Sequence, residues 1–164
     1  PKDIYWHFIG HLQTNKIKQI VPFVDLIHGV DSFKLLVEIN KQAEKQNRKV
    51  NCLLQVYIAS EATKFGFSPD ELKSLLATAE WQELKNINIA GLMGMATFTD
   101  DKNQIRSEFK SLKDLFDELK NTYFTNNTSF KEISMGMSDD YQIAIEEGST
   151  MVRVGSSIFG VRNY

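Results

Sequence analysis

The stretch FKEISMGMSDDYQIAIEEGSTMVRVGSSIFG, residues 130–160, decides the fold because it holds two apolar segments on either side of a short helical one. Residues 130–138 and 150–160 are typical of β-strands buried on both faces, since their apolar residues are nearly continuous. Between them, residues 139–148 predict a helix that ends at Gly148. A strand, a helix and a strand in this order predict a parallel β–α–β unit.

The same alternation extends toward the N-terminus, where four further strand-like segments lie at residues 5–10, 26–31, 50–58 and 87–96. Helical patterns separate them, and the clearest helix start is at Ser68, which is followed by Pro69 and by Glu71 in capping-box spacing. The helix after Ser32 is expected to bury Phe33, Leu36, Val37 and Asn40, and the helix before residue 130 to bury Phe109, Leu112, Leu115, Phe116 and Leu119.

Alternating β and α segments predict a parallel sheet covered by helices, either an open doubly wound sheet or a (β/α)8 TIM-type barrel. Such a barrel has eight strands and about 250 residues, whereas these 164 residues contain six predicted strands. The chain reaches its first strand within a few residues of Pro1 and does not begin with methionine. We therefore expect one domain, residues 1–164, that holds six of eight barrel units and lacks the first two.

The composition excludes several classes of protein. A hydrophobic content of 42% and a net charge of −2 describe a globular domain without the clustered basic face that nucleic-acid binding requires. No run of about 18 apolar residues indicates a membrane span, so we expect a cytoplasmic protein. Cys52 is the single cysteine and is expected in the core. The three histidines lack the spacing of a metal site, so no metal is predicted.

Small polar residues follow the last two predicted strands. Ser138 ends the fifth strand, and Gly155, Ser156 and Ser157 follow the sixth. Hydroxyl and backbone N–H donors at these two strand ends favour an anion site, because barrels of this type commonly hold a phosphate after strands seven and eight. The alternative for each segment alone is a helix cap at Ser138 and a simple turn at Gly155.

Arg153 lies inside the sixth apolar strand. A buried guanidinium costs several kcal/mol unless it is paired or hydrogen-bonded. One explanation is an ion pair with a carboxylate such as Asp25, Asp31 or Glu132. The other is a hydrogen bond to a ligand atom just beyond the phosphate-binding loop.

Two residues of the first segment leave alternatives open. His7 could line the cavity and act as a base, or it could be a hydrogen-bonded core histidine. Asn15 could line a site, or it could belong with Thr14 to the cap of a short helix that begins there.

Four motifs carry a resemblance to a known family: WHFIGHLQTNK (6–16), GLM (91–93), SMGMSDD (134–140) and EGSTMVRVGSSIFG (147–160). They resemble, in order and over nearly the whole chain, the signature stretches of the YggS/PROSC family, the pyridoxal 5′-phosphate (PLP) homeostasis proteins. The resemblance implies a single barrel similar to the N-terminal domain of alanine racemase, with PLP as its cofactor.

By motif, the resemblance implies that Arg153 faces the pyridine nitrogen and that Ser138, Gly155 and Ser156 hold the phosphate. The further cofactor contacts that we expect are Met137, His7 and Asn15. The family's Schiff-base lysine would precede Pro1, so no catalytic residue is assigned here; Lys16 and Lys64 match other family positions and are expected to be solvated. We expect weak, non-covalent binding and unpaired sheet edges that promote self-association, although the intact protein is expected to be a monomer.

Three functions remain open from the sequence. The first is a non-catalytic PLP carrier or buffer in vitamin B6 homeostasis, because an arginine at the ring nitrogen disfavours the protonated ring and weakens it as an electron sink. The second is a PLP-dependent amino-acid racemase of low activity. The third is a phosphate-recognising barrel of another metabolic class.

Overall fold

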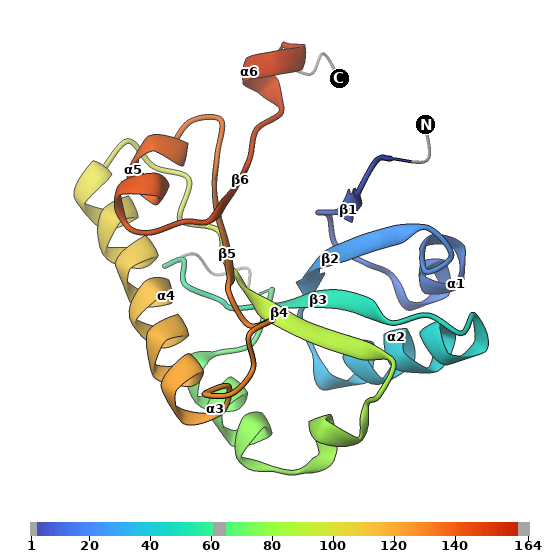
Figure 1. The fold of residues 1–164 in the computed structure, drawn as a ribbon. Coiled ribbons are helices and arrows are strands. Elements are labelled where there is room, and N and C mark those ends of the chain that lie inside the picture. Colours follow the sequence, from blue (N-terminus) through green and yellow to red (C-terminus); the bar gives the residue numbers. More distant parts are fainter. Residues whose placement is uncertain (1–2, 61–64, 161–164) are drawn as a thin grey trace.

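A computed structural model describes residues 3–60 and 65–160. All six strands join one sheet, every neighbouring pair is parallel, and the strand order follows the chain from β1 to β6. The six-unit α/β architecture is therefore confirmed, and Figure 1 shows it as a sheet that curves without closing. The strands are β1 Trp6–Phe8, β2 Val24–Val30, β3 Val50–Gln55, β4 Ile87–Met93, β5 Glu132–Met137 and β6 Met151–Arg153.

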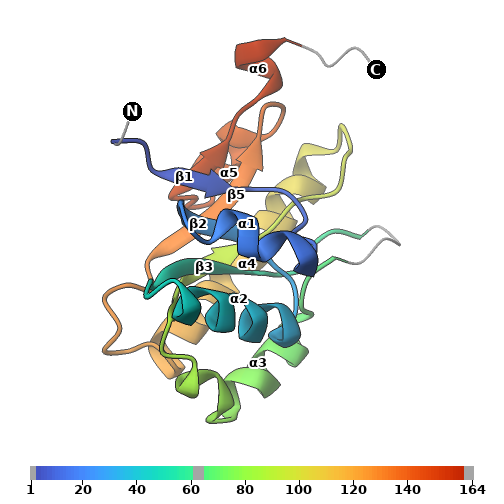
Figure 2. The same ribbon diagram turned by 90° about the vertical axis from the view of Figure 1, so that its right-hand side faces the viewer.

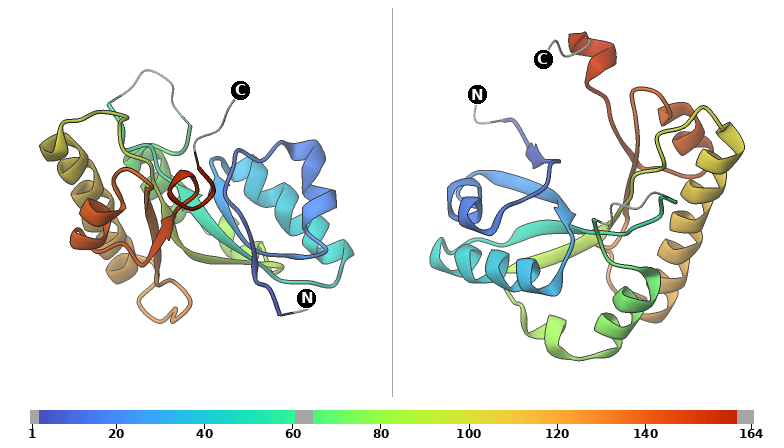
Figure 3. Two further views of the ribbon diagram at one scale, coloured as in Figure 1. Left: turned by 90° about the horizontal axis from the view of Figure 1, so that it is seen from above. Right: turned by 180° about the vertical axis from the view of Figure 1, so that it is seen from behind.

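Helices cover the outer side of the curved sheet, and the view from above in Figure 3 shows α2 and α4 on that side. The inner side faces the opening between β1 and β6 (Figure 1). The α-helices are α1 Ile17–Ile20, α2 Phe33–Lys45, α3 Pro69–Ala77, α4 Lys102–Thr122, α5 Tyr141–Glu146 and α6 Ser156–Phe159, and the 3-10 turns are η1 Thr14–Lys16 and η2 Glu80–Glu83.

The main core lies between the sheet and these helices. The predicted stripe of α4 is confirmed, because all five of its residues are buried. The predicted stripe of α2 is wrong in phase: Val37 is 39% exposed, and the buried residues are Leu35, Leu36, Ile39 and Ala43. A smaller apolar cluster lies on the inner face and consists of Leu26, Leu53, Ala90 and Met93, with Met151 packed against it.

Most of the predicted helix ends are confirmed. Ser68 and Glu71 form the reciprocal capping box, with N–O distances of 3.2 and 2.8 Å. Gly148 follows α5 with φ +94°, a conformation that glycine adopts without strain. Thr14 is not a cap: it lies inside η1, whose N-cap is Gln13, and no side chain caps that turn.

Two glycines allow close packing around β5. Gly91 in β4 has φ +154°, and a Cβ there would lie 1.8 Å from the backbone oxygen of Glu132. Gly136 in β5 has φ +93°, and a Cβ there would lie 2.6 Å from the Cβ of Ala144 in α5. Since only glycine accepts both the conformation and the contact, β4, β5 and α5 can pack this closely only with glycine at these two positions.

The sheet ends at β1 on one side and β6 on the other. Each of these strands has three residues and, in the part of the chain that the structure describes, pairs with a single neighbour. The predicted sixth strand, residues 150–160, is shorter than expected, because the chain turns at Gly155 into α6. Figures 1 and 2 show α6 projecting beyond the body of the domain, and its Phe159 is 87% exposed.

Among residues 3–60 and 65–160, no helix is both long and apolar enough to cross a lipid bilayer.

Candidate functional site

Arg153 donates two hydrogen bonds on the inner face of the sheet. Its Nη1 lies 2.7 Å from Ser134 Oγ on β5, and its Nη2 lies 3.1 Å from the backbone oxygen of Gly94, just after β4. Burial lowers the pKa of Arg153 to about 10, and the nearby charge of Asp140 opposes this shift. The guanidinium therefore remains charged near neutral pH.

No ion pair holds Arg153 among the described residues. Asp25 and Asp31 instead face histidine side chains, at 4.0 and 3.4 Å. Glu132 accepts a hydrogen bond of 2.8 Å from the Thr150 hydroxyl. The ion-pair explanation for this partly buried arginine is therefore wrong, and its partners among residues 3–60 and 65–160 are neutral oxygens.

Hydrogen bonds connect Arg153 with the opposite edge of the sheet through two fully buried side chains, Ser134 and His28. Ser134 Oγ lies 2.8 Å from Nδ1 of His28 on β2, and His28 Nε2 lies 3.2 Å from Nδ1 of His7 on β1. Ser134 and His28 are 0% and 1% exposed. We call Arg153, Ser134, His28 and His7 the inner-face chain.

Arg153 and the neutral ring of His28 together favour one direction of hydrogen bonding along this chain. Burial lowers the pKa of His28 to about 3, with further contributions from the charge of Arg153 and from His7, so its ring is neutral near neutral pH. Since a guanidinium has no acceptor, Ser134 Oγ must accept from Arg153, and its own hydrogen is directed to His28 Nδ1. This direction requires His28 to carry its proton on Nε2 and to donate to His7 Nδ1.

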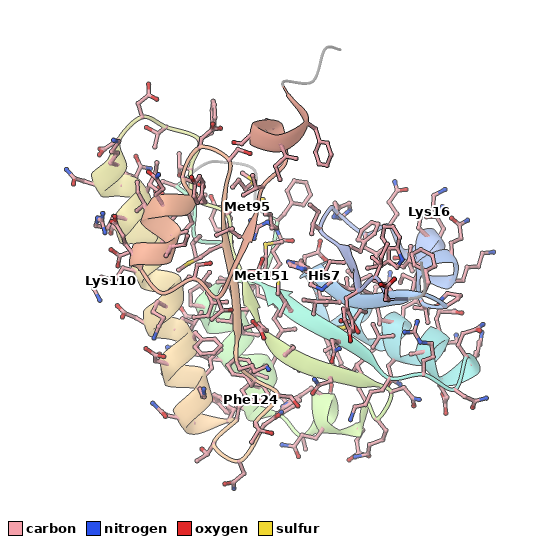
Figure 4. The ribbon with its side chains drawn as sticks, turned by 45° about the horizontal axis from the view of Figure 1, so that its top comes forward. His7, Lys16, Met95, Lys110, Phe124 and Met151 are labelled. Atoms are coloured by element: carbon pink, nitrogen blue, oxygen red, sulfur yellow. The ribbon has the colours of Figure 1, made fainter. Side chains whose placement is uncertain are left out.

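His7 also lines a cavity of about 460 Å³ on the inner face, together with Asp25, Asn51, Asn88, Glu132 and Met151. Figure 4 labels His7 and Met151, which come from the two edge strands and meet at this opening. Asn51 and Asn88 are hydrogen-bonded to each other at 2.9 Å, so two neighbouring strands present amide groups to the cavity.

Ser138 and the segment after β6 come together as predicted. Ser138 Oγ accepts hydrogen bonds from the backbone N–H of Gly155, at 3.2 Å, and of Ser157, at 3.4 Å. A Cβ on Gly155 would meet nothing within 4 Å, so the space in front of this backbone is open. Ser156 is exposed beside it. We call Ser138 together with Gly155, Ser156 and Ser157 the serine loop.

Ser138 does not cap a helix. The N-cap of α5 is Asp140, whose Oδ1 accepts from the backbone N–H of Met137 at 2.6 Å. The alternative explanation of Ser138 as a helix cap is therefore wrong, and its hydroxyl faces the neighbouring strand end instead. Met137 pairs in register with Arg153 and is 40% exposed.

The other predicted residues lie farther away. Asn15 is an exposed residue of η1, and no described contact connects it with the inner-face chain or the serine loop. Lys16 is exposed as expected, and Lys64 lies outside the described residues. Cys52 is fully buried, which confirms its place in the core.

Sequence reasoning missed Ser134 and His28 as members of the site. Each is a single polar residue within an apolar stretch, in ISMGM and LIHGV respectively. That pattern was available in the sequence, because a lone polar residue in a strand buried on both faces needs a partner across the sheet.

The chain is similar over nearly all of its length to known proteins. The family described as "Alanine racemase, N-terminal domain" matches residues 4–163. The chain is 42% identical to the pyridoxal phosphate homeostasis protein of Aquifex aeolicus, with 99% of this chain and 69% of that protein covered. It is 36% identical to the protein of the same name from Haemophilus influenzae, covering 99% of this chain and 67% of that protein.

A solved structure provides the third comparison. PipY of Synechococcus elongatus, with PLP bound, superposes with a TM-score of 0.84 at 31% identity and covers 96% of this chain and 71% of that chain. The chain thus spans about two thirds of the length of the curated relatives that it matches.

Proposed function

Because this chain belongs to the pyridoxal phosphate homeostasis proteins, within the alanine racemase N-terminal-domain family, we propose that it binds PLP. We propose further that it serves as a cytoplasmic carrier or buffer of this cofactor in vitamin B6 homeostasis, and not as a catalyst. PipY, with PLP bound, is similar to this chain over nearly all of its length.

The observation that carries the proposal is the partly buried charge of Arg153, which no ion pair holds among the described residues. Two of its five N–H donors have acceptors among the described residues, Ser134 Oγ and the Gly94 carbonyl. The remaining donors suit an acceptor on a ligand, and an unprotonated pyridine nitrogen is such an acceptor. The donor set of the inner face therefore fits the ring of PLP.

The serine loop fits the other end of the cofactor. Ser138 and Ser156 bring hydroxyl groups to the carboxyl ends of β5 and β6, and the Gly155 N–H, which donates to Ser138 Oγ in this structure, lies beside them. Hydroxyl and backbone N–H groups at such a place bind phosphate well. The open space in front of Gly155 leaves room for it. Met137 pairs with Arg153 in the sheet and directly precedes Ser138, so it is a candidate contact of the same ligand. His7 supports the ring end indirectly, through the inner-face chain.

The same residues argue against catalysis. PLP, when bound, supplies an electron sink that is strongest when its ring nitrogen is protonated. The positive charge of Arg153 opposes a second positive charge at that nitrogen, and the hydrogen bonds that Arg153 makes among the described residues go to a hydroxyl and a carbonyl, not to a carboxylate. Holding the cofactor is therefore the role that this environment supports best.

Equilibrium dialysis of the purified protein against PLP tests the proposal. We expect saturable binding at one site that is weakened by Arg153→Ala and by Ser138→Ala. Ser107→Ala, on the exposed side of α4, is the matched control and is expected to bind as the wild type does. Absence of binding by the wild type would refute the proposal. Loss of the α-hydrogen of alanine in deuterated water, with PLP present, would refute the carrier role and indicate the racemase.

A further inference from the structure

Arg153 depends on a second residue for its orientation. Its fixed acceptor is the Gly94 backbone oxygen, and its other acceptor is the Ser134 hydroxyl. A hydroxyl can rotate, and it accepts well in one direction only when its own hydrogen is bound elsewhere. His28 Nδ1, 2.8 Å away, is the atom that takes this hydrogen.

Resting on the proposed function, we propose that Ser134 and His28 are positioning residues that orient the free donors of Arg153, and so make the site selective for rings with an unprotonated nitrogen. Neither residue needs to touch the ligand. They act by fixing the direction in which the free N–H donors of Arg153 point toward the ligand.

A proton on Nδ1 of His28 would leave the hydroxyl hydrogen of Ser134 without an acceptor. If His28 carried a proton on Nδ1, Ser134 Oγ would accept hydrogen bonds from both His28 and Arg153. Its hydroxyl hydrogen would then lack an acceptor at a residue that is 0% exposed, and a buried donor without a partner is costly. The Arg153–Ser134 bond and the lone pair on His28 Nδ1 are therefore coupled.

The proton on His28 Nε2 is held in turn by His7. Nδ1 of His7 lies 3.2 Å away, and its Nε2 lies 4.0 Å from Asp25 Oδ2. His7 belongs to β1 and Arg153 to β6, the two edges of the sheet. The chain of donors thus runs across the whole inner face, from the ring end of the site to the opposite edge.

Two substitutions of His28 separate its two nitrogens. In His28→Asn, the amide oxygen lies close to the position of Nδ1 and can still accept from Ser134. In His28→Gln, the amide reaches toward the position of Nε2 and leaves no acceptor beside Ser134. Ser134→Ala removes the hydroxyl itself without adding bulk.

The ligands for the test are pyridoxine 5′-phosphate, which has the ring nitrogen, and benzyl phosphate, which does not. We expect His28→Asn to bind pyridoxine phosphate within about threefold of the wild type. We expect His28→Gln and Ser134→Ala to bind it about tenfold more weakly, the loss that corresponds to one hydrogen bond and its unsatisfied partner. Benzyl phosphate should bind equally to all four proteins.

Equal weakening of both ligands, or equal behaviour of His28→Asn and His28→Gln, would overturn the inference while leaving PLP binding itself intact. Failure of the wild type to bind either ligand would refute the proposed function instead. Histidine ¹⁵N NMR of the ligand-free protein then decides the hydrogen-bond chain independently. We expect His28 to be protonated on Nε2 and not on Nδ1, and a proton on Nδ1 would overturn the inference.

Discussion

Acid should destabilise this fold through His28. The pKa of His28 is lowered from its ordinary value of 6.5 to about 3 because the ring is buried beside Arg153. The unfolded chain therefore binds a proton below pH 6.5 that the folded chain does not bind. Because the folded pKa is the lower one, this contribution to stability is present above pH 6.5 and is lost as the pH falls toward 3.

The size of the effect follows from the linkage relation. Between pH 7.5 and 4.5 the unfolded state gains one proton at this position, which lowers the free energy of unfolding by about 2.7 kcal/mol. This interval ends above the folded pKa of His28, so the result depends on the ordinary value of 6.5 and hardly on the depth of the shift.

Urea unfolding at several pH values measures the effect, with His28→Asn as the comparison. The variant keeps an acceptor for Ser134 but has no imidazole to protonate. We expect the wild type to lose about 2.7 kcal/mol more than the variant between pH 7.5 and 4.5, with carboxylates contributing equally to both. Parallel stability curves for the two proteins would show that His28 takes up its proton in the folded state, and the reasoning would fail.

Two further predictions concern packing. Gly91→Ala should lower the free energy of unfolding by more than 3 kcal/mol, on the order of the largest single-residue effects, because the added Cβ would lie 1.8 Å from the Glu132 oxygen. Gly10→Ala, where nothing lies within 4 Å, is the control, and equal melting temperatures for the two variants would contradict the prediction. Cys52 should resist a thiol reagent in the folded protein and react after denaturation, since full burial raises the pKa of its thiol; fast labelling of the native protein would disprove this.

The alternation of strands and helices could be predicted because its signals are local. The capping box at Ser68 and the glycine at position 148 each act within one turn of helix, so no distant contact can override them easily. The strand segments were visible because parallel strands under helices are apolar on both faces. The short helix after Gly155 was missed, since its apolar residues Ile158 and Phe159 have the composition of a strand.

The phase of α2 could not be read from its sequence. The segment FKLLVEINKQAEK contains two overlapping apolar stripes, one through Phe33 and Val37 and one through Leu35 and Ile39. Both have helical spacing, so only packing against the sheet selects between them. The structure buries the second stripe.

The inner-face chain shows the same limit for the site. Ser138 and Gly155 were found because they lie at strand ends, where the topology alone brings them together. Ser134 and His28 are 106 residues apart, and their contact depends on the phase and register of several strands. A lone polar residue marks that a partner is needed, but the identity of the partner follows only from the assembled sheet.

The agreement between strand order and chain order bears on how the protein is made. In Figure 3 the colours run in sequence around the sheet from β1 to β6, because each strand lies beside the one synthesised before it. A chain that leaves the ribosome N-terminus first can therefore add its strands one at a time to an edge that already exists. If the strands add in this order, Arg153 on β6 joins the sheet after both of its acceptors, Ser134 Oγ and the Gly94 carbonyl, so its guanidinium leaves water only when they are in place.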